Sequence, residues 1–220
     1  GRSKKNKEKK GIISKSYLEL IRTFKELKKY KQIVRFLFAR IIYNDALITV
    51  IAFGGPYAYT QFGFDMDTNG KLMIFAIVLN VFAGIGAFLF GFIDDYIGGK
   101  KTIQLTNAGF VIALVIAFLA PIIKNGELYF WLSGILIGIF MGPNQAASRS
   151  FMGRLIPDNK ENEFYGFFAF SGKATAFLGP MLFTVVVSYT DSMRLSLLML
   201  AFLFLIGIFL LRKVSDPQIN

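Results

Sequence analysis

Two apolar runs of membrane-spanning length, joined by a short polar stretch, constrain this chain more than any other feature. Residues 72–93 and 102–123 are each long enough to cross a bilayer as a helix. The polar stretch at 91–101 holds an acidic pair, two adjacent glycines and two lysines. Because unpaired backbone groups are not tolerated in hydrocarbon, this stretch is predicted to be a tight loop at one membrane face.

The composition extends this interpretation to the whole chain. Hydrophobic residues make up 54% of its 220 residues, which is too apolar for a soluble domain of this size. The sequence therefore predicts an all-α polytopic membrane protein with six transmembrane helices. The predicted bundle covers 32–213, with spans at 33–59, 72–93, 102–123, 128–148, 164–189 and 195–211, between a basic segment 1–31 and a tail 214–220.

The positive charge is concentrated at one end. Of the 25 Lys and Arg residues, 12 lie in residues 1–31. Residues 13–27 repeat apolar side chains at helical spacing between basic ones, which predicts an amphipathic helix on the membrane surface. Most other basic residues fall in loops on the same side, so the positive-inside rule predicts that both termini are cytoplasmic. Such a segment favours anionic lipid, and no nucleic-acid partner is expected.

The chain contains neither Cys nor His. This removes disulfides, thiolate chemistry, histidine proton relays and the commonest metal ligand. No nucleophile–base pair and no phosphate-cradling glycine loop after a strand is present in the sequence. We therefore expect no enzyme activity, no cofactor and no metal site. The chain begins Gly-Arg-Ser without a signal peptide, which favours a fragment or a processed piece.

Charged residues inside the predicted spans need a partner or a watery cavity. At about 1.5 Å of rise per residue, Asp45 lies about 18 Å and Lys173 about 14 Å from the cytoplasmic ends of their spans. Both are thus predicted to lie near mid-membrane, where transporter sites occur. Asp45 would bind an amine or carry a proton, and Lys173 would bind a carboxylate. The alternative is a structural ion pair of Asp45 with Arg40 or Lys173.

Polar residues gather in the first, second, fourth and fifth spans, which predicts a central cavity lined by these four helices. The stretch 142–145 is predicted to interrupt the fourth span. The side-chain amides of Asn144 and Gln145 would then gate the path or contact the substrate. Alternatively, they would satisfy the backbone groups that the broken helix leaves free. The glycine repeat at 134, 138 and 142 is predicted to serve helix packing. The candidate residues for substrate or proton coupling are Asp45, Lys173, Asn44, Arg40, Asn80, Asn144 and Gln145.

Two levels of resemblance to a known family follow from these residues. Major facilitator superfamily transporters share the loop signature G-x-x-x-D-x-x-G-x-K/R-K/R. Its defined positions are occupied here by Gly91, Asp95, Gly98, Lys100 and Lys101, and the resemblance implies that this loop is a conformational motif. Two details differ from the usual loop. Gly99 stands where a basic residue is common, and Asp94-Asp95-Tyr96 replaces the more usual triplet of a small residue, Asp and a basic residue. Beyond the loop, the segments 39–45, 142–150, 154–157, 163–167 and 171–175 resemble the C-terminal half of the autophagy-related vacuolar amino-acid effluxer-like family.

The resemblance covers about residues 30–213 and implies half of a twelve-helix secondary transporter. Such a transporter would move a small polar solute through alternating access around a midplane site. The family name implies that the solute is an amino acid and that the direction is efflux. Asp95 would cap a helix of the missing N-terminal half. Its expected partners are a small-molecule substrate, the lipid bilayer, and that missing six-helix half or a second copy of this chain. The expected location is a bacterial plasma membrane. Two alternatives stay open, a complete six-helix homodimerising transporter and a non-transporting scaffold or receptor.

Overall fold

The computed structural model describes residues 30–68, 70–158, 160–174 and 176–216. The predicted amphipathic helix at 13–27 lies outside these residues. The helices of the described part are α2 (Lys31–Phe62), α3 (Lys71–Ile97), α4 (Gly99–Leu119), α5 (Gly126–Leu155), α6 (Glu161–Ala174), α7 (Leu178–Thr190) and α8 (Met193–Arg212), with one 3-10 turn, η1 (Ala120–Ile122). Six segments are long and apolar enough to cross a membrane, the fifth being α6 and α7 together. The prediction of an all-α, six-span integral membrane protein is confirmed.

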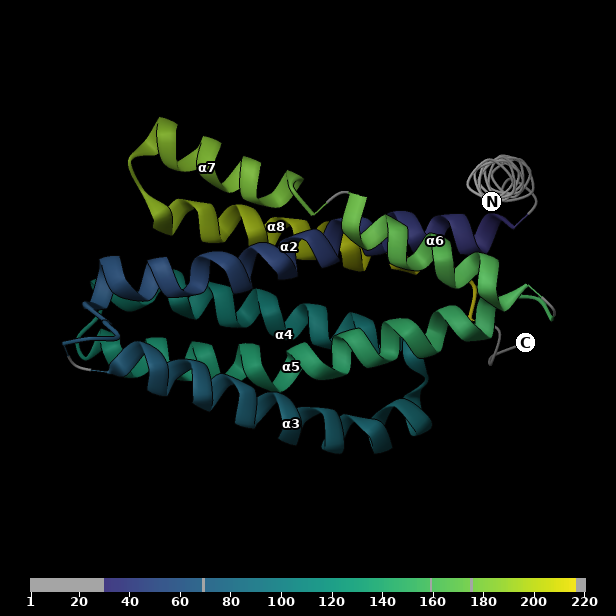
Figure 1. The fold of residues 1–220 in the computed structure, drawn as a ribbon, viewed down its shortest axis with the longest axis horizontal. Helices are drawn as coiled ribbons and strands as arrows, with labels where there is room; N and C mark the ends of the chain where they lie inside the picture. The colour runs from purple at the N-terminus through teal and green to yellow at the C-terminus, as the bar shows by residue number, and fades with distance from the viewer. Residues whose placement is uncertain (1–29, 69, 159, 175, 217–220) are drawn as a thin grey trace, which may run out of the picture.

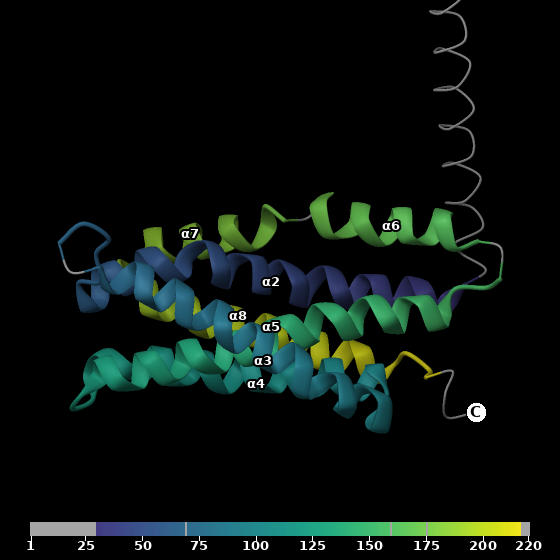
Figure 2. The same ribbon diagram turned by 60° about the horizontal axis from the view of Figure 1, so that its bottom comes forward.

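The helices pack side by side in a bundle (Figure 1). The main packing partners run in the order α3, α5, α4, α8 and α2, and α6 and α7 lie end to end along α2 (Figure 2). Helix α2 begins and α8 ends at the same end of the bundle, which we call the terminal end. Helix α3 and the α6–α7 segment are the least buried of the spans. Their exposed apolar side chains include Ile77, Val81 and Phe88 on α3 and Phe170 and Val185 on the α6–α7 segment.

The glycines of α5 form the contact with α3. A Cβ atom at Gly138 would lie 2.6 Å from the carbonyl oxygen of Leu79, and one at Gly142 would lie 2.8 Å from that of Ala83. Only glycine lets the two backbones approach this closely. The geometry bears out the packing interpretation of the glycine repeat.

Two expected breaks in the helices are absent. Helix α3 continues to Ile97 and α4 begins at Gly99, so only Gly98, at φ +82°, separates them. The predicted loop at 91–101 is therefore mostly helix, because one glycine in a conformation open mainly to glycine suffices for the turn. The predicted interruption at 142–145 is also wrong, because α5 runs unbroken through Pro143.

Polar contacts at the terminal end tie α4 and α2 to the residues that follow α8. The Lys100 ammonium donates to the carbonyl oxygens of Val214 at 2.6 Å and Arg212 at 3.4 Å. Gln32 and Ser215 exchange two hydrogen bonds of 3.0 Å each. A cation at the C-terminal end of a helix satisfies its last carbonyls and complements its dipole. Lys100, a residue of the loop signature, therefore also supports the fold.

We expect Lys100→Met to lower thermal stability while keeping the aliphatic stem. The variant loses a charge-assisted contact to the end of α8, which is typically worth about 1–2 kcal/mol and corresponds to a few degrees in Tm. A thermal melt of the purified protein measures the change. Lys101→Met is the matched control because Lys101 is exposed. Equal melting of the two variants would show that the contact contributes nothing.

Candidate functional site

Asp45 is a buried carboxylate in the middle of α2. Its side chain is 4% exposed, and its Oδ1 atom has no hydrogen-bond partner among the described residues. The backbone N–H of Gly179, in the first turn of α7, interacts with the carboxylate. The Thr49 hydroxyl donates to the backbone oxygen of Asp45 at 2.7 Å. The carboxylate therefore faces the amino end of a helix, where free N–H groups and the helix dipole favour negative charge.

Arg40 lies closer to the terminal end of α2 and contacts α6. Its Nη1 donates to the carbonyl oxygen of Phe168 at 2.9 Å and to the Ser171 hydroxyl at 3.4 Å. The guanidinium stacks on the Phe168 ring, 3.6 Å from the ring centroid. A Cβ atom at Gly172 would lie 2.9 Å from Nη1, so the α6 backbone approaches this arginine closely. Arg40 thus sits against the carboxyl end of α6.

The break in the fifth span lies between these two contacts. Helix α6 ends at Ala174 and α7 begins at Leu178, so the fifth span, predicted as one helix, is divided in two. Pro180 falls in the first turn of α7, where a missing N–H costs no helical bond. The carboxyl end of α6 meets the positive Arg40, and the amino end of α7 meets the negative Asp45. Each α2 charge therefore matches the dipole of the half-helix that it faces.

The structure separates the other predicted charges and amides. Asp45 forms no salt bridge with Arg40 or Lys173 in the described part of the chain, so the structural ion pair is not present. Lys173 is exposed in the last turn of α6, and Asn44 is half-buried on α2. Asn80 is exposed and donates to its own helix, to the carbonyl of Ala76 at 2.8 Å.

Asn144 belongs to a buried polar network between helices. Its side-chain amide donates to the Thr106 hydroxyl at 2.8 Å and to the Asn107 side-chain oxygen at 2.9 Å. Its carbonyl accepts from Ser148, whose hydroxyl also pairs with that of Tyr43 at 2.8 Å. These bonds join α2, α4 and α5, so Asn144 links helices rather than satisfying a broken helix locally, which was the predicted alternative to substrate contact. The sequence missed the network because α4 looked nearly free of polar side chains.

A groove opens beside this network, between α5 and α6. Its volume is about 570 Å³, and Gln145, Ala146, Arg149, Ser150 and Tyr165 line it. The sequence singled out only Gln145, because Arg149 was assigned to a connector at 149–163 whereas α5 continues to Leu155. The i, i+4 spacing of Gln145 and Arg149 places them on one helix face and was the signal available.

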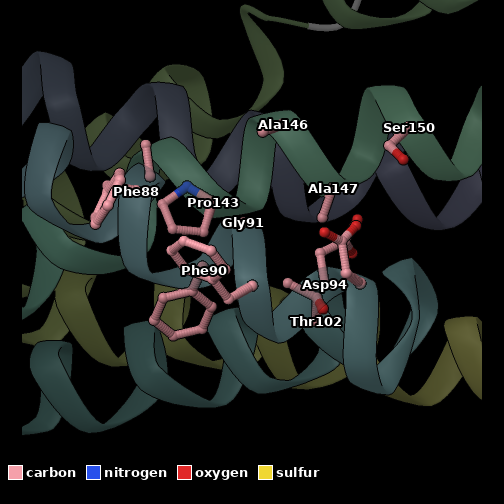
Figure 3. Close-up of a pocket in the computed structure, with 12 residues that line it drawn as sticks. Phe88, Phe90, Gly91, Asp94, Thr102, Pro143, Ala146, Ala147 and Ser150 are labelled. Carbon is pink, nitrogen blue, oxygen red and sulfur yellow. The ribbon is translucent and has the colours of Figure 1, made fainter.

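A second cavity, about 370 Å³ in volume, lies between α3, α4 and α5, and Gly91 and Asp95 of the loop signature are among the residues that line it. Phe88, Phe90 and Pro143 lie at one end of it, and Asp94, Thr102 and Ala147 gather at the other (Figure 3). Asp94, one of the residues that line this cavity, forms an ion pair with Arg154, with 3.7 Å between Oδ2 and Nη2. Asp95, the carboxylate singled out from the sequence, is exposed, as are Gly91 and Lys101.

This architecture is that of one half of a major facilitator superfamily transporter. The fold is similar to the xylose transporter XylE from E. coli in its inward open conformation, with a TM-score of 0.66 and 16% sequence identity. The similarity covers 84% of this chain and 47% of that one.

The sequence matches the vacuole effluxer Atg22-like family over residues 1–218, and the chain belongs to this family. It is 29% identical over 206 residues to the uncharacterized MFS-type transporter YxiO of Bacillus subtilis, covering 93% of this chain and 46% of that protein. It is 28% identical over 218 residues to autophagy-related protein 22-1 of Aspergillus clavatus, covering 94% of this chain and 35% of that protein. The family resemblance is confirmed, and the chain spans half or less of these relatives.

Proposed function

We propose that this chain forms the C-terminal six-helix half of a secondary active transporter for a small polar solute. In this proposal the two-part fifth span and α2 line the solute path, and the path opens alternately to each side of the membrane. Three observations support it. The chain belongs to an effluxer-like family, it aligns with about half of its bacterial relative, and α3 and α6–α7 leave long apolar faces uncovered.

The single observation that carries the proposal is the buried Asp45 beside the break. A carboxylate oxygen without a partner is costly inside a membrane protein, so such a group is retained where a solute or a proton binds. Breaks in membrane helices are tolerated where the backbone lines a cavity. We infer that Asp45 binds a proton or the amine of the solute, with Lys173 just before the break in reach of an anionic group.

The finer parts of the proposal rest on the family and on charge. An amino acid as solute and export as direction follow the family's description as a vacuole effluxer. A bacterial plasma membrane, with the terminal end cytoplasmic, fits the bacterial relative and the 12 basic residues that precede residue 32.

Reconstitution of the full-length protein in liposomes tests this function. We expect saturable flux of at least one member of a panel of L-amino acids, driven by an imposed pH gradient. Protein-free liposomes and the ionophore-collapsed gradient are the controls. A folded protein that moves no member of the panel under any gradient would favour a scaffold or receptor.

The intact mass of the protein purified from its native membrane separates two assemblies. We expect a mass near twice the 24.7 kDa of this chain, because the second six-helix half would be covalently joined to it. A mass of about 24.7 kDa would instead indicate a complete protomer, whose uncovered α3 and α6–α7 faces would be buried against a second copy.

A further inference from the structure

Two arginines without a counter-charge lie near each other on neighbouring helices. Arg40 on α2 and Arg149 on α5 lie close to the point where a hydrogen bond of 2.8 Å between the Tyr43 and Ser148 hydroxyls joins these two helices. At about 1.5 Å per residue, Arg40 lies about 14 Å and Arg149 about 9 Å from the terminal ends of their helices. Neither arginine forms a salt bridge with a carboxylate in the ranges that the structure describes. Arg149 is exposed and Arg40 is half-buried, so an anion in front of Arg149 would be attracted by both cations.

The groove in front of Arg149 offers the hydrogen-bond donors that an anion requires. Gln145 and Ser150 lie on the same helix as Arg149, and Tyr165 faces them from α6. The Tyr165 hydroxyl contacts the backbone oxygen of Arg149 at 3.4 Å, which fixes the ring at the wall of the groove. Arg40 makes its two bonds to α6 through Nη1, so it is held in place and contributes mainly its charge.

We propose that Arg149, Gln145 and Ser150 form an oxyanion subsite that binds the carboxylate of the transported solute, with Tyr165 as its wall and Arg40 adding a second positive charge nearby. A guanidinium donates two parallel hydrogen bonds to a carboxylate, which a lysine cannot do. The subsite lies nearer the terminal end of the bundle than Asp45, which faces the break. It therefore captures the solute's acidic group at the terminal end, before the solute reaches Asp45, which takes the amine or the proton deeper in the bundle. This inference rests on the proposed function and specifies the chemistry of its solute.

Binding of matched ligands to the purified full-length protein tests the subsite. The probes are glycine and L-leucine, methylamine and isopentylamine as their decarboxylated amines, and isovalerate as an acid without an amine. We expect the wild-type protein to bind at least one acid more tightly than its matched amine. Arg149→Gln should weaken binding of that acid 10- to 100-fold, the usual effect of losing a charge-assisted pair, and change amine binding less than twofold. Arg149→Lys should restore only part of the loss.

Arg212→Gln is the matched control, because Arg212 is an exposed arginine at the terminal end of α8. It should leave all affinities unchanged. Wild-type protein that binds no carboxylate selectively, or an Arg149→Gln variant that loses acids and amines equally, overturns the subsite. Either result leaves the proposed function standing if the protein still shows saturable flux.

A phosphate headgroup could present the same chemistry. The binding measurement is therefore repeated in nanodiscs with and without phosphatidylglycerol. We expect the selective effect of Arg149→Gln on the acid in both. An effect of Arg149→Gln that appears only as lost stabilisation by phosphatidylglycerol would assign the subsite to lipid and overturn the proposal for the solute.

Discussion

Asp45→Asn should reduce pH-driven flux at least tenfold while the protein remains folded and inserted. The substitution keeps the size of the side chain and one acceptor oxygen. It replaces the other oxygen by an NH2 donor, so the side chain can neither release a proton nor attract an amine by its charge. The Oδ1 atom has no partner in the described part of the chain, and the oxygen that the amide keeps can still accept from the Gly179 N–H, so the contact with α7 can be retained. Flux in liposomes under an imposed pH gradient measures the loss of coupled transport. Solute exchange across the membrane at equal pH on both sides measures the transport that does not depend on the gradient.

Asp158→Asn is the control for this variant, because Asp158 is an exposed carboxylate outside the helices. Its flux should match that of the wild-type protein. If Asp45→Asn transports with the same pH dependence as the wild-type protein, Asp45 is not the coupling group. Loss of folded protein would instead show that the carboxylate supports the contact with α7, and Asp45→Glu would then be tested for rescue of the fold without coupling.

Gly86→Val should cause a large loss of stability. An ideal Cβ atom at Gly86 would overlap the backbone carbonyl of Ile139 on α5, and a backbone cannot move aside as a side chain can. Overpacking of this kind costs about 3 kcal/mol or more, which we expect to appear as a fall in Tm of about 10 °C or as failure to insert. A thermal melt of the purified variant measures it.

Gly84→Val on the same helix is the matched control. A Cβ atom at Gly84 meets nothing within 4 Å, so only the small difference in helix propensity applies. Equal melting of the two variants would contradict the close α3–α5 contact.

The contact also explains why Pro143 does not break α5. Proline cannot donate to the carbonyl four residues earlier, which belongs to Ile139, and that carbonyl packs against Gly86 instead.

The length and number of the spans could be predicted because they depend on local composition. A run of about twenty apolar residues has no other stable state in a membrane than a helix. The limits of the helices depended on tertiary contacts and were harder to predict. Gly142 and Pro143 are helix breakers by propensity, yet α5 continues through them because α3 packs against its glycines.

The candidate site could be predicted in part. Asp45 and Arg40 stood out because ionisable residues are rare in apolar runs, and the structure places both against the broken fifth span. The partners of these two charges could not be foreseen, because each charge faces the end of a half-helix rather than a side chain of opposite charge. Asn144 looked like a candidate for the same reason as Asp45, but its partners Thr106 and Asn107 lie on another helix. Single-sequence reasoning does not pair side chains across helices.

The central claim is that the break between α6 and α7 lines the solute path. Accessibility of a cysteine placed at Ala176 tests it most directly, since this chain has no cysteine of its own and Ala176 lies in the break. The full-length Ala176→Cys protein, with any other cysteines replaced, is treated in liposomes with a membrane-impermeant thiol reagent. The account predicts labelling that a transported solute slows and that a non-transported analogue leaves unchanged. A thiol that reacts equally fast with and without a transported solute, or one reached only by reagents that partition into lipid, would contradict it.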